Sequence, residues 1–145
     1  MAFPFRKLLV PIDFHEHSLG AIEIAKNIAQ INGGMVTLLY VVPMDESIGG
    51  PMYEEDFKKQ AEKDAARLAE IGSQRLQGLK YEIVTEIGDP ATGIIDTAAS
   101  REVDAIVIGT HGRKGLRRIL MGSVAEEVLR EAKCPVIALR LERKS

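Results

Sequence analysis

A segment in the last third of the chain combines spaced glycines, cationic side chains and a serine. Its glycines are Gly109, Gly112, Gly115 and Gly122, and Ser123 follows the last of them. Its basic residues are His111, Arg113, Lys114, Arg117 and Arg118. No acidic residue lies between Gly109 and Gly122. Because glycine lacks a Cβ and lets backbone N–H groups approach a ligand, this composition favours binding of an anion such as phosphate.

The residues on either side of this segment predict a strand before it and a helix after it. The apolar run 105–108 contains β-branched residues and predicts a strand buried on both faces that ends at Gly109. Ser123-Val124-Ala125-Glu126 has the form of a capping box, which predicts Ser123 as a helix N-cap. An apolar stripe follows at Val124, Ala125, Val128, Leu129 and Ala132. A strand, a glycine loop and a helix N-terminus with unpaired N–H groups together form an anion site.

The glycine spacing is neither a P-loop nor a Gly-x-Gly-x-x-Gly dinucleotide fingerprint. Gly109-x-x-Gly112, nine further residues and then Gly122-Ser123 resemble the G-2x-G-9x-G-(S/T) signature of the ATP-binding universal stress proteins. Three further features match this family, and they are Pro11-x-Asp13, Val41 at the end of the second strand, and Cys134-Pro135-Val136. The resemblance covers essentially the whole chain.

The resemblance implies one domain over residues 1–145, with an open parallel five-stranded sheet in the order 3-2-1-4-5 and helices on both faces. This is the Rossmann-like, adenine nucleotide alpha hydrolase-like fold. It further implies an adenine nucleotide as cofactor, ATP, ADP or AMP, with Mg²⁺ as an optional companion. The implied binding residues are Pro11, Asp13, Val41, Ile108, Gly109, His111, Gly112, Arg113, Gly122, Ser123 and Val124. In the family the aspartate contacts the ribose, and main-chain groups at the end of the second strand meet the adenine.

Several of these residues have a simpler structural interpretation. Asp13-x-x-Glu16 also has the form of a capping box, so Asp13 could be a helix N-cap. The side chain of Val41 suits a core better than a ligand site. The glycines could serve turn geometry alone, and the basic run could be a solvated face. Where relatives often carry serine, this chain has His15, which leaves the start of the first helix open.

The rest of the chain alternates predicted strands with predicted helices. The strands are expected at 8–12, 35–42, 81–87, 105–108 and 135–139, and the third is expected near an edge because its apolar residues alternate. Helices are predicted over 53–77 and around the apolar stripes 21–29, 91–99 and 124–132, with Asp89 as an N-cap before Pro90. Loop 43–52 is rich in proline and glycine and is expected to act as a lid. The alternation predicts an α/β domain with a parallel sheet.

The composition indicates the expected cellular compartment and the expected kinds of partner. The chain has 145 residues, 46% apolar and 28% charged, with a net charge of −2, which disfavours nucleic-acid coating. A single cysteine cannot form an internal disulfide, and neither a signal peptide nor a membrane span is evident. A cytoplasmic protein is therefore expected. The final strand, Val136 to Leu139, is too apolar for an exposed edge, and the family pairs this edge in a homodimer.

Three classes of function remain open on the sequence. The leading one is a regulatory protein that uses a bound adenine nucleotide as a signal in a stress response. The second is a slow ATPase or adenylating enzyme, for which Asp13 is the only candidate base or metal carboxylate at the predicted strand ends. The third is a dimerising relative that binds no nucleotide, and the intact glycine-serine signature disfavours it. The three histidines, His15, His17 and His111, lack the spacing of a metal site.

Overall fold

Strand and helix alternate throughout the described part of the chain. The computed structural model describes residues 4–14, 16–43, 54–111 and 120–141. Its elements are β1 (Lys7–Pro11), α1 (Glu16–Asn32), β2 (Met35–Val42), α2 (Glu54–Arg75), β3 (Lys80–Ile87), α3 (Pro90–Ser100), β4 (Ala105–His111), α4 (Leu120–Glu131) and β5 (Val136–Leu141). Every predicted strand and helix is present, which confirms the α/β class. None of the described helices is long and apolar enough to cross a membrane.

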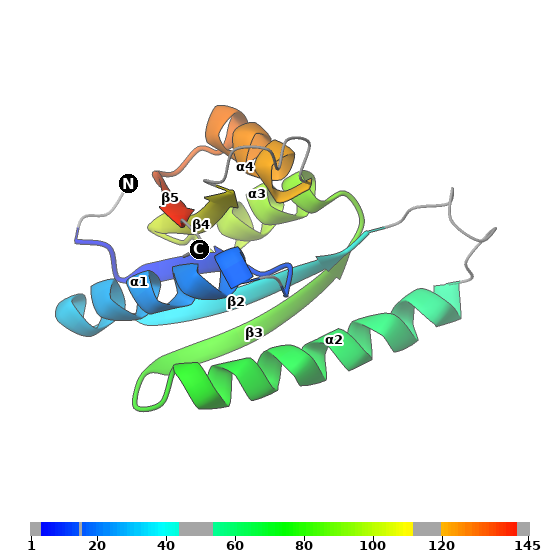
Figure 1. Ribbon diagram of the computed structural model, residues 1–145, viewed down its shortest axis with the longest axis horizontal. Coiled ribbons are helices and arrows are strands. Elements are labelled where there is room, and N and C mark those ends of the chain that lie inside the picture. The colour runs from blue at the N-terminus through cyan, green and yellow to red at the C-terminus, as the bar shows by residue number, and fades with distance from the viewer. Residues whose placement is uncertain (1–3, 15, 44–53, 112–119, 142–145) are drawn as a thin grey trace, which may run out of the picture.

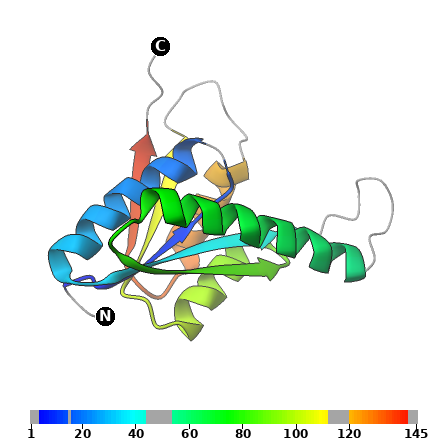
Figure 2. The ribbon, with the colours of Figure 1, turned by 90° about the horizontal axis from the view of Figure 1, so that it is seen from below.

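The strands form one parallel sheet in the order β3-β2-β1-β4-β5, as the resemblance implies. Helices α1 and α2 cover one face, and α3 and α4 cover the other (Figures 1 and 2). The chain runs outward from β1 through β2 to β3 and then returns to β4 on the other side of β1. The strand order therefore reverses between β1 and β4. In open parallel sheets, ligands bind at the carboxyl ends of the strands beside such a reversal.

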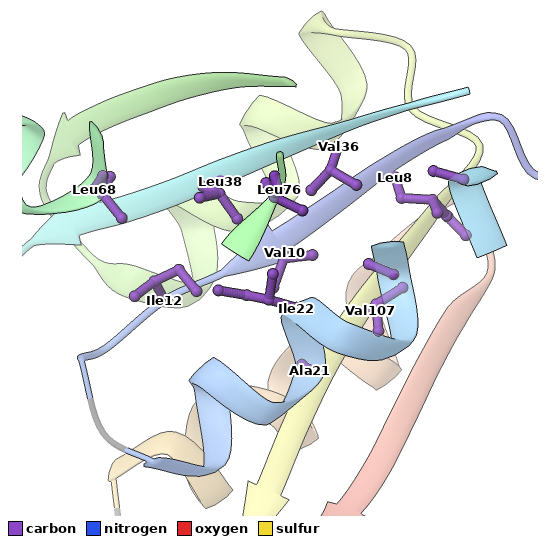
Figure 3. Packing of buried hydrophobic residues seen from close by; sticks show 13 residues of the cluster. Leu8, Val10, Ile12, Ala21, Ile22, Val36, Leu38, Leu68, Leu76 and Val107 are labelled. Atoms are coloured by element: carbon purple, nitrogen blue, oxygen red, sulfur yellow. The ribbon is translucent and has the colours of Figure 1, made fainter. Parts of the chain in front are cut away.

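Each face of the sheet carries its own apolar core. On the face covered by α1 and α2, Ile22 and Leu68 from the helices pack with Val10 and Leu38 from the strands, and all four are fully buried (Figure 3). On the other face, Leu9 and residues of the neighbouring strands pack against α3 and α4. Because side chains alternate along a strand, adjacent residues of β1 serve opposite cores. Apolar side chains of β1 and β4 are therefore buried on both faces of the sheet.

Two helix ends follow the turn chemistry that the sequence predicts. Helix α1 ends before Gly33, which adopts a left-handed φ of 66°, as expected for a glycine after a helix. Helix α3 begins at Pro90, and the carboxylate of Asp89 accepts the backbone N–H of Thr92 at 3.0 Å. Asp89 is therefore the N-cap, as predicted.

Two boundaries around the predicted anion loop were wrong. Strand β4 does not stop at Gly109 but continues to His111, because Gly109 continues the backbone pairing by lying opposite Leu139 of β5. Helix α4 begins at Leu120, so Ser123 lies inside the helix and is not its N-cap. Leucine and methionine are strong helix formers, and Leu120 and Met121 extend the helix by about a turn toward its N-terminus.

The predicted apolar stripes are also narrower than expected. Leu129 of α4 is 51% exposed, whereas its neighbour Val128 is fully buried. Ala99 at the end of α3 is exposed as well, and Thr97 takes a buried position on that helix. A helix packed on a sheet buries only the side chains that point directly at it, so apolar residues at the margin of the stripe stay in water.

Several predictions fall outside the described residues. They concern the lid at 44–52, the glycines Gly112 and Gly115, the basic residues Arg113, Lys114, Arg117 and Arg118, and His15.

Candidate functional site

The strand registers relate the carboxyl ends of three neighbouring strands. Strand β1 pairs with β2 so that Lys7 lies opposite Met35 and Pro11 opposite Leu39. The pairing with β2 continues to Ile12, whose N–H donates to the carbonyl oxygen of Leu39 at 2.7 Å. At the same offset, the next residue, Asp13, corresponds to Val41. On its other side β1 pairs with β4 at two positions, Leu8 opposite Ala105 and Leu9 opposite Ile106, and the later residues of the two strands lie beyond this pairing.

Val41 lies near the end of β2, Asp13 follows β1, and Thr110 lies near the end of β4, so all three belong to the carboxyl edge of the sheet. We call these three residues the carboxyl-edge row. Gly109 and His111 flank Thr110 on β4, and Pro11 is the last residue of β1. Five of the predicted binding residues thus lie at or near the carboxyl ends of β1, β2 and β4. They are Pro11, Asp13, Val41, Gly109 and His111.

Asp13 is held at this edge by contacts of its backbone. Its N–H donates to the hydroxyl of Ser18 at 3.1 Å, and Ser18 is buried in the first turns of α1. The helix itself begins at Glu16, so the position immediately before it is residue 15 and not Asp13. This position argues against the interpretation of Asp13 as an N-cap. Phe14, the next residue, adopts a left-handed φ of 65°, which is rare for a bulky side chain.

Val41 and Ile108 face the core on the side of α3 and α4. Ile108 is fully buried, and Val41 is 7% exposed. Helix α3 packs tightly over Val41, because a Cβ added at Gly93 would lie 2.8 Å from one of its methyl groups. The side chain of Val41 is therefore a core side chain, as its sequence interpretation suggested. What Val41 can offer to a ligand is its main chain at the edge of the sheet.

Strand β4 and helix α4 supply the other side of the site. The hydroxyl of Thr110 donates to the carbonyl oxygen of Leu139 at 3.0 Å, which adds a side-chain hydrogen bond between the ends of β4 and β5. Because a crossover helix starts at the carboxyl end of the strand before it, the first turn of α4 lies at the same edge. Gly122 is the third residue of that turn, and its N–H is among those without an acceptor inside the helix. Ser123 is exposed, and Val124 is half-buried.

A cluster of polar and aromatic residues on the α1 and α2 face was missed from the sequence. The guanidinium of Arg67 lies over the ring of Phe14, 3.8 Å from its centroid. The rings of Phe14 and Tyr40 are tilted, with centroids 4.8 Å apart. Asp64 is only 3% exposed, and both of its carboxylate oxygens accept from the amide of Gln60, at 3.3 and 3.2 Å.

One signal in the sequence could have indicated this cluster. Asp64 stands seven residues after Phe57 and four before Leu68, so it occupies the apolar stripe of α2. A carboxylate at such a position is buried only if other groups satisfy it.

The surroundings of Tyr40 raise the pKa of its phenol. Burial raises its pKa, and the negative charges of Asp64 and Asp13 raise it further, whereas the positive charge of Arg67 opposes them. The phenol therefore stays protonated and can donate a hydrogen bond at neutral pH.

The described residues contain no group of three or more histidine, cysteine, aspartate or glutamate side chains that could hold a metal ion. A five-stranded parallel sheet with a reversal between β1 and β4 defines an open α/β fold, the class in which ligand sites lie at the strand ends. The sequence profile of the Universal stress protein family matches residues 4–140. The chain belongs to the universal stress protein family.

Individual relatives agree with this assignment. Universal stress protein MJ0531 of Methanocaldococcus jannaschii is 32% identical over 146 residues, which cover 97% of this chain and 85% of the relative. The solved structure of MJ0577 from the same organism gives a TM-score of 0.77 at 27% identity, over 97% of this chain and 99% of that one. A universal stress protein of Archaeoglobus fulgidus, solved in complex with dAMP, gives a TM-score of 0.67 at 24% identity, over 94% and 98% of the two chains.

Proposed function

We propose that this universal stress protein binds an adenine nucleotide at the carboxyl-edge row and acts as a nucleotide-dependent regulatory factor in a stress response. The observation that carries the proposal is the row itself. Strand β1 lies between β2 and β4, where the strand order reverses, and the carboxylate of Asp13 follows its carboxyl end. The Archaeoglobus fulgidus protein in complex with dAMP supports it, because a protein with this fold holds an adenine nucleotide.

Each part of the row suits one part of a nucleotide. The carboxylate of Asp13 can accept hydrogen bonds from the ribose hydroxyls. The main chain at Val41 lies level with Asp13 and can pair with the adenine edge. Gly109 and the first turn of α4 at Gly122 present backbone to the phosphates, and a helix N-terminus favours negative charge. Mg²⁺, when present, would be held largely by the phosphates, as is usual for this ion.

Identification of the bound nucleotide is the first test of this function. The protein is purified gently and denatured, and mass spectrometry identifies the small molecule released. ATP, ADP or AMP is the expected product. The same protein, freed of ligand, is then titrated with each nucleotide by calorimetry. Release of no nucleotide, together with no heat on titration with any of the three, would exclude the proposed function.

Asp13→Ala is expected to weaken ATP binding by about 10- to 100-fold. Hydrogen bonds to a charged group contribute about 1.5–3 kcal/mol, and this substitution removes the only charged acceptor of the carboxyl-edge row. Calorimetric titration measures the change. Asp96→Ala is the matched control, because Asp96 is an exposed aspartate on α3. An Asp13→Ala variant that binds ATP as tightly as the parent would remove Asp13 from the site.

We further propose a homodimer that pairs β5 with its copy. β5 is an edge strand of the sheet, and Val136, Ile137 and Leu139 on it are apolar and only half-buried in the single chain. The carbonyl of Pro135 accepts from Ile106 of β4, so alternation along a parallel ladder directs the N–H of Ala138 away from β4. An unpaired apolar edge of this kind invites pairing with another strand.

Sedimentation at micromolar concentration is expected to show two chains for the parent and one for Ala138→Pro. Proline at position 138 removes an outward N–H without removing a bond to β4, and proline is tolerated on edge strands for this reason. Circular dichroism should show that the variant remains folded. A parent protein that sediments as a single chain contradicts the dimer.

A further inference from the structure

Phe14 holds a backbone conformation that local structure does not explain. The described part of the chain has two non-glycine residues with positive φ, Phe14 at 65° and Glu102 at 52°. Glu102 follows the end of α3, where its N–H donates to Ala99, and left-handed residues are common at helix ends. Phe14 instead precedes a helix and carries a large side chain. Strain of this kind persists only where surrounding structure enforces it, and it concentrates at ligand sites.

Two side chains from separate elements contact the Phe14 ring. The Arg67 guanidinium of α2 lies 3.8 Å from the centre of the Phe14 ring, and the Tyr40 ring of β2 packs 4.8 Å away, centroid to centroid. We call Phe14, Tyr40 and Arg67 the aromatic clamp. Its members adjoin the carboxyl-edge row directly, since Phe14 follows Asp13 and Tyr40 precedes Val41. Any movement of the Phe14 backbone rotates the peptide group next to Asp13.

We propose that the aromatic clamp positions Asp13 for the ribose hydroxyls, with Phe14 and Arg67 as positioning residues that do not touch the nucleotide. This inference rests on the proposed function. The clamp would hold the left-handed turn at Phe14, and the turn sets the direction of the Asp13 carboxylate. The contact also makes α2 part of ribose recognition, although α2 covers a different part of the sheet from α4. The combined influence of Asp13 and Arg67 on the Tyr40 phenol agrees with this compact arrangement.

The test compares ATP with 2′,3′-dideoxy-ATP, which carries the same base and phosphates but lacks both ribose hydroxyls. The ratio of their calorimetric affinities isolates ribose recognition. The parent is expected to favour ATP by about tenfold or more, and Asp13→Ala to abolish the preference. Arg67→Met removes the cation over the ring and is expected to lower the ratio by about two- to fivefold. Phe14→Gly removes the ring and frees the backbone at this position, and should lower the affinity ratio by about tenfold.

Two controls separate positioning from general damage. Arg67→Lys retains a cation and should recover most of the ratio. Lys63→Met removes an exposed cation from the same helix, one turn earlier, and should leave the ratio unchanged. Thermal unfolding checks that each variant is folded, and the exposed Arg67 can be replaced even if Phe14→Gly fails to fold.

The outcomes distinguish this inference from the proposed function. If Asp13→Ala abolishes the preference while Arg67→Met and Phe14→Gly keep it, the clamp has no positioning role and the proposed function stands. Equal weakening of both ligands by Arg67→Met also overturns the inference, because the charge then acts on the phosphates or on the fold. If Asp13→Ala leaves the preference intact, the ribose role of Asp13 fails and the inference fails with it.

Discussion

Gly122→Val is expected to weaken ATP binding by at least about 100-fold while leaving adenosine binding nearly unchanged. The proposed site uses backbone N–H groups in the first turn of α4 to hold phosphate, and Gly122 is the third residue of that turn. A branched side chain there would stand between backbone and ligand. Two lost hydrogen bonds to a charged phosphate account for an effect of this size. Adenosine lacks the phosphates, so its affinity should change little.

The position of Gly122 inside a helix makes this substitution informative. A helical residue has negative φ, so valine introduces no left-handed strain, and stability should fall little or not at all. Ser123→Ala is the matched neighbour. Because Ser123 is exposed and lies within α4, its loss should change the free energy of unfolding by less than about 0.5 kcal/mol. Urea unfolding checks the stability of both variants, and calorimetric titration with ATP and adenosine checks the binding by Gly122→Val. Parent-like ATP binding by Gly122→Val would put the phosphate site elsewhere.

Gly34→Ala should reduce the free energy of unfolding by about 3 kcal/mol or more. A Cβ at this position would overlap the carbonyl oxygen of Arg6 and lie 2.6 and 2.7 Å from its carbonyl carbon and Cα. That carbonyl accepts the N–H of Met35 at 2.8 Å, and Gly34 itself donates to Ala29 at 2.8 Å. Relief of the overlap therefore requires movement of the backbone that joins α1 and β2 to the start of β1.

Gly33→Ala is the control for Gly34→Ala. Gly33 has a φ of 66°, but nothing lies within 4 Å of an added Cβ, so only the left-handed conformation opposes alanine. The expected cost is about 1–2 kcal/mol. Urea unfolding of the three proteins, with the slope m compared to confirm a common unfolded state, measures both values. A loss for Gly34→Ala no larger than that for Gly33→Ala would show that the backbone accommodates the methyl group easily.

The sequence by itself determined the elements whose signals are local. The apolar run of β2 predicts its bounds, Met35–Val42, and the Asp89-Pro90 pair predicts the start of α3. These features depend on side-chain periodicity and on hydrogen bonds between residues three or four apart, which a short stretch of chain settles alone. The resemblance at the glycines, Asp13 and Val41 further predicted the strand order and the family, and both predictions are confirmed.

Only the tertiary structure decided how residues from distant elements meet. The offsets of β1 from β2 and from β4 bring the end of β1 beside those of its neighbours, and a strand does not encode its offset from a neighbour. The same holds for the clamp of Arg67 and Tyr40 on Phe14, which joins three elements, and for the burial of Asp64. Ser123 met a local rule for an N-cap, but Leu120 and Met121 extended the helix past it. A capping bond contributes only about 1 kcal/mol, so the form of a capping box does not by itself fix where a helix begins.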